Sequence, residues 1–155
     1  MKTGDKIITL FSTGLYTGYF PIAPATFSTL TLGVVSYRLL SYLHVYLYGL
    51  ITLILFFLAV WLSDESERIF GKTDCRYIVI DELVGFLITM FLLPFNWMNL
   101  VLGFLFFRFF DIVKPPPANY FNNRKKGGLD VVLDDAIAGI YANLLLQVLY
   151  HGVFH

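Results

Sequence analysis

The chain has 155 residues, the length of one domain, and hydrophobic residues make up 57% of it against only 14% charged residues. Its mean hydropathy of +0.71 is far from that of an average soluble protein, so the composition indicates a membrane protein. A formal net charge of zero argues against a nucleic-acid partner. The single cysteine, Cys75, excludes an internal disulfide and a zinc site built from several cysteines.

The amino-terminal segment predicts a short re-entrant or interfacial helix over residues 7–20. It ends in a turn rich in glycine and proline at residues 17–24, because prolines bar a continuous helix there. A signal peptide is the alternative interpretation, but the Ser-Thr-Gly run at 12–14 interrupts its apolar centre and Pro24 fits a cleavage site poorly. The interfacial helix is therefore preferred.

Five helices are predicted after this segment, over about 28–42, 44–62, 78–93, 97–113 and 133–150. Thr26 or Ser28 is expected to cap the first, and a polar loop over 63–76 follows the second. The second helix is the cleanest membrane span, because it carries no charge and its length is close to the roughly twenty residues that cross a bilayer. The predicted fold is therefore all-α, a polytopic membrane helix bundle of about four to five spanning helices that forms one domain over residues 1–155.

The basic residues gather on one side of this layout. Nine of the eleven lysines and arginines fall in the amino terminus, in the loop 63–77 and in the loop 114–131, namely Lys2, Lys6, Arg68, Lys72, Arg76, Lys114, Arg124, Lys125 and Lys126. The other two, Arg38 and Arg108, lie within helices, and the side chain of Arg38 is expected to extend to the membrane surface. The loops on the opposite side contain no lysine or arginine. Because basic loops stay on the cytoplasmic side, we expect this side to face the cytoplasm.

The same layout brings six ionised residues to one depth, just inside that boundary, namely Asp81, Glu82, Arg108, Asp111, Asp134 and Asp135. A charge within an apolar span costs about 2.5–3.5 kcal/mol on insertion scales, so such residues usually have a partner and a function. Gly85 and Gly139 each follow an aspartate by four residues, and small residues at these positions let neighbouring helices approach closely.

Carboxylates gathered with one arginine, beside a lysine-rich loop, favour a site that handles phosphate. Hard oxygen ligands suit Mg²⁺, which binds through one or two carboxylates together with phosphate oxygens and water. Arg108 and Lys114 are then natural phosphate clamps, Arg108 through its planar fork. A metal-bound water and an attacking aspartate both remain open as the nucleophile.

Each of these features also has a purely structural interpretation. Asp134 alone suits a helix N-cap. Asp81 and Glu82 suit the positive end of a helix dipole. Arg108 and Asp111 suit a structural ion pair. Their convergence at one depth favours a functional site, since ionisable residues within a membrane are functional candidates by default.

Four motifs run along the chain in order: Thr17-Gly18-x-x-Pro21-x-Ala23-Pro24-Ala25-Thr26, Asp81-Glu82-x-x-Gly85, Phe107-Arg108-x-x-Asp111-x-x-Lys114-Pro115 and Asp134-Asp135-x-x-Ala138-Gly139. Together they resemble the bacterial phosphatidylglycerophosphatase A family over nearly the whole chain. The resemblance implies Mg²⁺-dependent hydrolysis of phosphatidylglycerophosphate to phosphatidylglycerol and inorganic phosphate. It also implies a multi-pass protein of the bacterial cytoplasmic membrane, with its active site toward the cytoplasm and a membrane phospholipid as substrate.

The resemblance carries catalytic roles to Asp81, Glu82, Arg108, Asp111, Lys114 and Asp135. It implies a metal site made of Asp81, Glu82, Asp134 and Asp135, which also supply any catalytic base. Arg108 and Lys114 would hold the phosphate, with Asp111 orienting Arg108 or joining the metal ligands.

Thr26 and the turn before it would close over the phosphate with hydroxyl and backbone donors. The chain departs from the family in this turn, because Ala25 and Ser28 stand where the family has glycine. If the backbone needs a positive φ at either position, its geometry here differs from that of the family.

Two other classes of membrane protein fit the sequence less well than a lipid phosphatase. A CDP-alcohol phosphotransferase would show an Asp-Gly-x-x-Ala-Arg run, which this chain lacks. A small ion- or proton-coupled transporter would spread its charges along a path through the membrane, whereas the charges predicted here gather at one boundary.

Overall fold

The computed structural model describes residues 3–73, 75–124 and 126–153, so Lys2 and Lys125 lie outside the described residues. Every regular element in these ranges is helical, which confirms the all-α class. In chain order they are α1 (Thr3–Ser12), the 3₁₀ turn η1 (Thr17–Tyr19), α2 (Pro24–Ser28), the π-helical turn η2 (Thr29–Gly33), α3 (Val34–Leu40), α4 (Val45–Phe70), α5 (Ile80–Thr89), α6 (Trp97–Val113), α7 (Ala118–Arg124) and α8 (Gly128–Val153).

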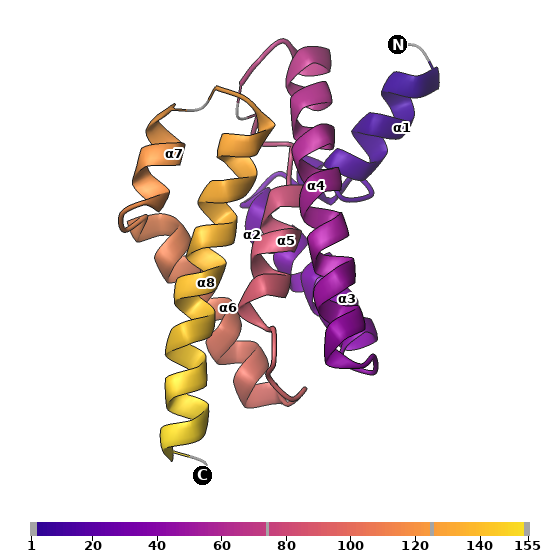
Figure 1. The fold of residues 1–155 in the computed structure, drawn as a ribbon. Helices are drawn as coiled ribbons and strands as arrows, with labels where there is room; N and C mark the ends of the chain where they lie inside the picture. Colours follow the sequence, from indigo (N-terminus) through magenta and orange to yellow (C-terminus); the bar gives the residue numbers. More distant parts are fainter. Residues whose placement is uncertain (1–2, 74, 125, 154–155) are drawn as a thin grey trace.

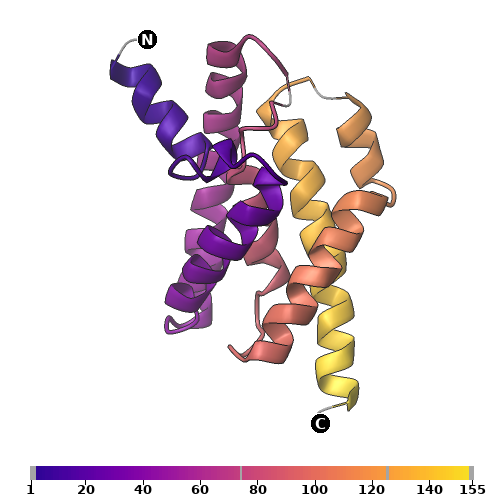
Figure 2. The ribbon, with the colours of Figure 1, turned by 180° about the vertical axis from the view of Figure 1, so that it is seen from behind.

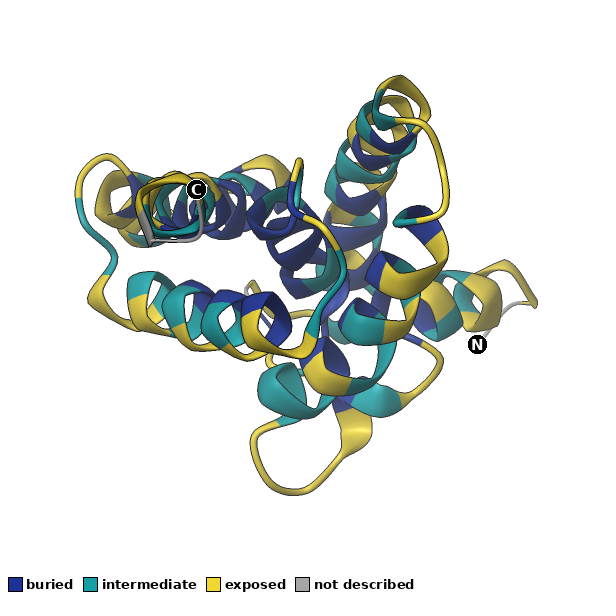
Figure 3. Ribbon diagram, turned by 90° about the horizontal axis from the view of Figure 1, so that it is seen from below, coloured by how far each residue is buried: buried dark blue, intermediate teal, exposed yellow. Residues whose placement is uncertain are grey.

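The short helix α5 lies at the centre of the bundle, in contact with α4, α6 and α8 (Figures 1 and 2). Eight of its ten residues are buried, and in the view from below the buried residues of the neighbouring helices face this centre (Figure 3). Phe86 and Leu87 of α5 pack there with Phe107 of α6, and burying each such side chain stabilises the fold by about 1.5–3 kcal/mol. Because α5 is surrounded, the acidic residues in its first turn are buried as well.

The molecule has two distinct ends (Figure 1). The amino terminus, the end of α4 and the connection from α7 to α8 lie at one end, and the carboxyl terminus and the turns after α3 and α5 lie at the other. As predicted, the turns after α3 and α5 contain no lysine or arginine, and Arg38 lies within a helix, in the last turn of α3. Its guanidinium lies 4.5 Å from the ring centroid of Tyr42 and 4.2 Å from that of Phe95.

Two helices within the described ranges are long and apolar enough to cross a membrane by length and composition, Val45–Phe70 and Gly128–Gly152. The helix α5 has ten residues and is about 15 Å long, which is half of the roughly 30 Å hydrocarbon core of a bilayer. The described bundle therefore has two candidate spans where the sequence predicted four to five.

The first half of the predicted polar loop at 63–76 is helical, because α4 continues to Phe70. Arg68 pairs with Glu65 one turn earlier, so these charged residues support the helix instead of ending it. Gly71 ends α4 in a left-handed conformation, with φ of 64°.

The extension of α4 also explains why α8 begins five residues before its predicted start at 133. The carboxylate of Asp64, on α4, accepts a hydrogen bond from the backbone N–H of Gly128. This contact satisfies one of the free N–H groups at the start of α8, as a local cap would. Such a cap from 64 residues away leaves no signal in the local sequence.

The central helix is shorter than the predicted range of 78–93, since it begins at Ile80 and ends at Thr89. Leu92 takes a positive φ of 63°, which a right-handed helix cannot include. The chain therefore turns before Pro94, although residues 90–93 are apolar enough to continue the helix.

The helical stretch predicted over 28–42 begins earlier, at Pro24, and runs through α2, η2 and α3. Its N-cap is Ala23, so the predicted capping roles of Thr26 and Ser28 were wrong. Proline suits the first position of a helix because its missing N–H would have no partner there.

The predicted interfacial helix over 7–20 is shorter and lies earlier, as α1, which packs against α4 and leans away from the other helices (Figure 2). Gly14, with φ of 55°, and the two residues after it then turn the chain into η1. This turn packs Gly18 of η1 against Tyr77, in the segment that precedes α5.

Candidate active site

A cavity of about 260 Å³ lies where the start of α5, the end of α6, α7 and the first half of α8 meet the start of α2 and the segment 75–78. It is lined by Pro24, Ala25, Cys75, Arg76, Ile78, Asp81, Glu82, Asp111, Lys114, Asn122, Val131, Asp134 and Asp135. Of the eight predicted site residues, six line this cavity, while Arg108 and Thr26 do not. The acidic cavity, as we name it, therefore joins residues from all three acidic motifs.

The acids come from two central helices. Asp81 and Glu82 lie in the first turn of α5, and Asp134 and Asp135 lie about two turns into α8. Each of these four residues is at most 8% exposed. Because α8 begins at Gly128, Asp134 is not a helix N-cap, and that structural interpretation is excluded.

Lys114 is the cation inside this group of acids. It ends α6 in a left-handed conformation (φ 47°), and its ammonium donates a hydrogen bond to the carboxylate of Asp134. It also donates to Asn122 Oδ1 at 3.2 Å and lies 3.7 Å from Asp111 Oδ1. Burial acts to lower the pKa of Lys114, but the hydrogen bond and charge of Asp134, with the charges of Asp135 and Asp111, outweigh it and raise that pKa. Lys114 therefore stays charged through neutral and moderately alkaline pH.

Arg108 lies behind the acids and does not line the cavity. Its guanidinium donates a hydrogen bond to Glu82 and lies 3.1 Å from Asp111 Oδ2. The predicted pairing of Arg108 with Asp111 is thus confirmed. Arg108 therefore contacts two carboxylates that line the cavity, those of Glu82 and Asp111, but does not itself line the cavity.

The turn that departs from the family pattern is not strained at the altered positions. Ala25 and Ser28 both lie in α2, and the left-handed residue of this turn is Ala23, with φ of 49°. Neither replacement meets a positive φ, so the expected change in geometry does not arise. Pro24 and Ala25 contribute to the cavity in place of Thr26.

Five lining residues were not predicted for the site, namely the apolar Ile78 and Val131 and the three residues Cys75, Arg76 and Asn122. Asn122 lies on α7, which was predicted to be part of a basic loop, and its only sequence signal is a polar side chain eight residues after Lys114. Cys75 and Arg76 precede the run that leads into Asp81, and Arg76 was counted only as an orientation signal.

The charges of the cavity suit a divalent cation. Five carboxylates line it, against the two cationic side chains of Lys114 and Arg76. Carboxylate oxygens are the ligands that Mg²⁺ prefers, so the donor chemistry fits. Among the described residues, however, no three acidic, histidine or cysteine side chains lie close enough together to hold a metal ion. Two of the carboxylates are instead paired with cations, Asp134 with Lys114 and Glu82 with Arg108.

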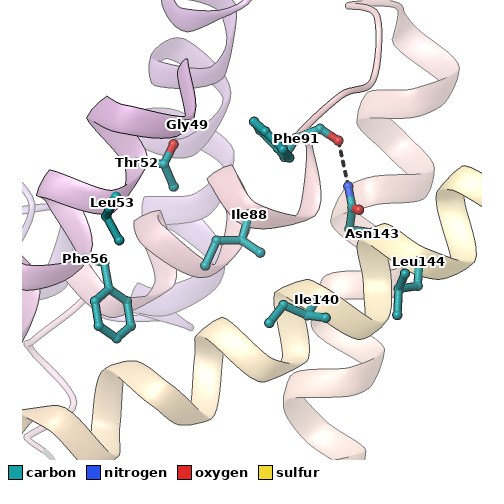
Figure 4. A pocket seen from close by; sticks show the side chains of 9 residues that line it. All are labelled: Gly49, Thr52, Leu53, Phe56, Ile88, Phe91, Ile140, Asn143 and Leu144. Carbon is teal, nitrogen blue, oxygen red and sulfur yellow. Dashed lines mark hydrogen bonds between the residues drawn. The ribbon is translucent and has the colours of Figure 1, made fainter. Parts of the chain in front are cut away.

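A second cavity, of about 460 Å³, lies between α4, α5 and α8. Figure 4 shows the apolar side chains of Leu53, Phe56 and Ile88 along it, with Asn143 on α8. The Asn143 amide donates to the carbonyl oxygen of Phe91 at 2.7 Å, so its polar group serves to hold the turn after α5. No ionisable residue lines this cavity, which leaves the acidic cavity as the candidate for chemistry.

Comparison with known proteins points to one family. The profile described as "PgpA: Phosphatidylglycerophosphatase A" matches residues 10–150. The chain is 34% identical over 140 residues to a phosphatidylglycerophosphatase A of Haemophilus influenzae, covering 90% of this chain and 86% of that protein. It is 32% identical over 143 residues to the Escherichia coli protein of the same name, covering 92% and 83%.

A third relative bears a different name. A Bacteroides thetaiotaomicron protein, provisionally named a phosphatidylinositol-3-phosphatase, is 32% identical over 155 residues, covering 96% of each chain. No solved structure matches the chain. The relatives thus agree on a phosphatase, and their names differ in the lipid headgroup.

Proposed function

Because the chain belongs to the phosphatidylglycerophosphatase A family and is a phosphatase, we propose that it hydrolyses phosphatidylglycerophosphate to phosphatidylglycerol and inorganic phosphate. The observation that carries this proposal is the acidic cavity, in which Lys114 lies between carboxylates from α6 and α8. Ionised groups gathered at one cavity, and not along a path between the two ends, favour hydrolysis over transport.

The membrane is the natural location for this reaction. We propose that the protein is an integral, multi-pass protein of the bacterial cytoplasmic membrane, with α4 and α8 among its spanning helices. The end that holds the amino terminus and the α7–α8 connection would then face the cytoplasm, because most of the basic residues belong to it. The acidic cavity, between the start of α5 and α7, would lie toward that face.

In this proposal the residues divide into three roles. Lys114 binds the terminal phosphate, for which its ammonium is already held in place by Asn122 and Asp111. Arg108 positions Glu82 and Asp111, and supports the phosphate through them. A carboxylate among the four on α5 and α8 accepts the proton of the attacking group.

Mg²⁺ is part of the proposal as the expected cofactor. Asp81, Glu82, Asp134 and Asp135 would hold it, after Asp134 and Glu82 have exchanged some of their contacts with Lys114 and Arg108. When bound, the ion supplies positive charge that neutralises the acids and the phosphate oxygens.

The test is phosphate release by the purified full chain in detergent, with phosphatidylglycerophosphate and Mg²⁺. Asp81→Asn and Asp135→Asn are expected to abolish release while leaving the helix content, measured by circular dichroism, unchanged. Glu65→Gln is the matched control, because Glu65 pairs with Arg68 outside the cavity. Full activity in both aspartate variants would contradict the site.

A second substrate belongs in the same assay. The third relative's name refers to phosphatidylinositol 3-phosphate, which, like phosphatidylglycerophosphate, carries a phosphomonoester beyond a phosphodiester. Comparing kcat/KM for the two lipids would show which headgroup the cavity accepts.

A further inference from the structure

Arg76 lines the acidic cavity, and nothing in the chemistry proposed so far uses it. We propose that Arg76 binds the phosphodiester of the lipid, and so forms a second anion subsite beside the one that Lys114 makes for the terminal phosphate. This inference rests on the proposed function, because only a lipid with two phosphate groups requires both subsites. Both headgroups named above meet this requirement.

The ion pairs of the cavity leave Arg76 in a special position. Lys114 pairs with Asp134 and Asp111, and Arg108 pairs with Glu82 and Asp111. Arg76 takes part in none of the ion pairs found among the described residues, and its side chain is exposed. Of the two cations that line the cavity, Arg76 is therefore the one that can bind an anion without breaking one of these ion pairs.

The backbone that follows Arg76 is held against the amino-terminal part of the chain. The N–H of Val79 donates to the carbonyl oxygen of Ser12 at 2.9 Å, and the N–H of Ile78 donates to that of Cys75 at 2.8 Å. A Cβ on Gly18 would lie 2.1 Å from the carbonyl oxygen of Tyr77, so η1 packs directly on this segment where only glycine fits. A subsite on this segment is thus preorganised, which lowers the entropy cost of binding.

An aromatic contact also restrains the side chain. The Tyr77 ring stacks on Tyr19, with centroids 4.8 Å apart, and the Arg76 guanidinium carbon lies 5.2 Å from the Tyr77 ring centroid. A cation–π contact of this kind holds the guanidinium in a limited region while leaving its N–H groups available. These N–H groups form a planar fork, which matches two oxygens of a phosphodiester better than an ammonium does.

Charge explains why the lipid would require this residue. Five carboxylates line the cavity and repel any anion that approaches. The terminal phosphate has Lys114, and Mg²⁺ in the proposed function, to offset that repulsion. The phosphodiester carries its own negative charge, and Arg76 is the lining cation that remains for it.

The test separates the two phosphates with two competitive inhibitors. Deacylated phosphatidylglycerol, which is glycerophosphoglycerol, presents only the diester, and inorganic phosphate resembles only the terminal group. In Arg76→Gln we expect the KM for phosphatidylglycerophosphate and the inhibition constant of glycerophosphoglycerol to rise about tenfold, the effect of losing one charge-assisted contact. The kcat and the inhibition constant of phosphate are expected to change less than about twofold. Arg76→Lys should restore part of the loss, since it keeps the charge without the fork.

Arg68→Gln is the matched control, because Arg68 is an exposed arginine of α4 that pairs with Glu65 outside the cavity. It should leave both inhibition constants unchanged. An unchanged KM in Arg76→Gln, or an equal loss of both inhibitors, would overturn the subsite while leaving the proposed function intact. If the wild-type protein released no phosphate from the lipid, the proposed function would fail, and the subsite with it.

Discussion

Gly85 and Gly139 face each other across the contact between α5 and α8, and neither has room for a side chain. A Cβ on Gly139 would lie 2.3 Å from the carbonyl oxygen of Gly85, and one on Gly85 would lie 2.8 Å from that of Asp135. Each glycine follows an aspartate of the acidic cavity by one helical turn, Asp81 on α5 and Asp135 on α8. The close approach of the two backbones is thus what brings these carboxylates to one cavity.

The first prediction concerns this helix contact. Gly139→Ala should destabilise the protein by about 1–3 kcal/mol, because backbone atoms must move apart to admit the methyl group. It should also lower phosphate release, since the carboxylates separate with the helices. Thermal unfolding in detergent measures the first effect. Gly152→Ala, near the end of the same helix, is the control, because a Cβ there meets nothing within 4 Å.

The second prediction concerns Lys114. Lys114→Met removes the cation held by Asp134, Asp111 and Asn122, and leaves the buried carboxylate of Asp134 without it. In the proposed function Lys114 binds the terminal phosphate, and removing one partner of such a charge pair costs about 2–5 kcal/mol of binding, so kcat/KM should fall about 100-fold or more. Lys72→Met, an exposed lysine in the turn after α4, should retain wild-type activity. Equal activity in both variants would remove Lys114 from the site.

The third prediction tests Asn122 as a positioning residue. Its side-chain oxygen accepts a hydrogen bond from Lys114 at 3.2 Å, so Asn122→Ala should raise KM severalfold, by about the 0.5–1.5 kcal/mol that one hydrogen bond contributes. Asn122→Gln keeps a neutral amide acceptor on a longer side chain and should recover part of the loss. The neighbouring Asn123, which is exposed and outside the cavity lining, provides the control as Asn123→Ala. Loss in the Ala variant without any recovery in the Gln variant would argue against positioning.

The fourth prediction concerns the metal. Removing divalent ions with EDTA should abolish phosphate release, and added Mg²⁺ should restore it. Mg²⁺ should also raise the thermal unfolding temperature of the wild-type protein, because a ligand that binds only the folded state stabilises it. The same addition should have little effect on Asp81→Asn and Asp135→Asn. A shift of the same size in these variants would show that Mg²⁺ binds elsewhere.

The fifth prediction concerns orientation in the membrane. With Cys75 replaced by serine, single cysteines can be introduced at two exposed positions, Lys72→Cys in the turn after α4 and Tyr42→Cys in the turn after α3. These two turns belong to opposite ends of the molecule (Figure 1). An impermeant thiol reagent added to inverted vesicles should label position 72, and the same reagent added to intact spheroplasts should label position 42. Labelling of both from one side would contradict the proposed topology.

Sequence reasoning located much of the candidate site without a structure. Asp81, Glu82, Asp111, Lys114, Asp134 and Asp135 all line one cavity. They could be found because ionised groups are costly within apolar segments and therefore stand out there. The role of Gly85 and Gly139 was accessible for a similar reason, since small residues at helical spacing from the acids indicate close helix packing.

Where sequence reasoning failed, distant parts of the chain determined the local structure. Asp64 caps α8 from another helix, so the start of α8 at Gly128 was missed. Charges after residue 62 were interpreted as a loop, although pairing one turn apart keeps them helical. Thr26 was assigned to the phosphate site, but the turn at Ala23 brings Pro24 and Ala25 to the cavity instead.

The sequence by itself determined the helical class, the two ends of differing charge and the ionised residues that would need charged partners once buried. These features follow from the composition and periodicity of each segment alone. Apart from the Arg108–Asp111 pair, three residues apart on one helix, only the tertiary structure decided which of those charges pair. Lys114 meets Asp134, Arg108 meets Glu82, and Arg76 stays outside the ion pairs among the described residues. The reason is physical: an ion pair depends on distances of a few ångströms between side chains far apart in the chain, and helix packing alone sets those distances.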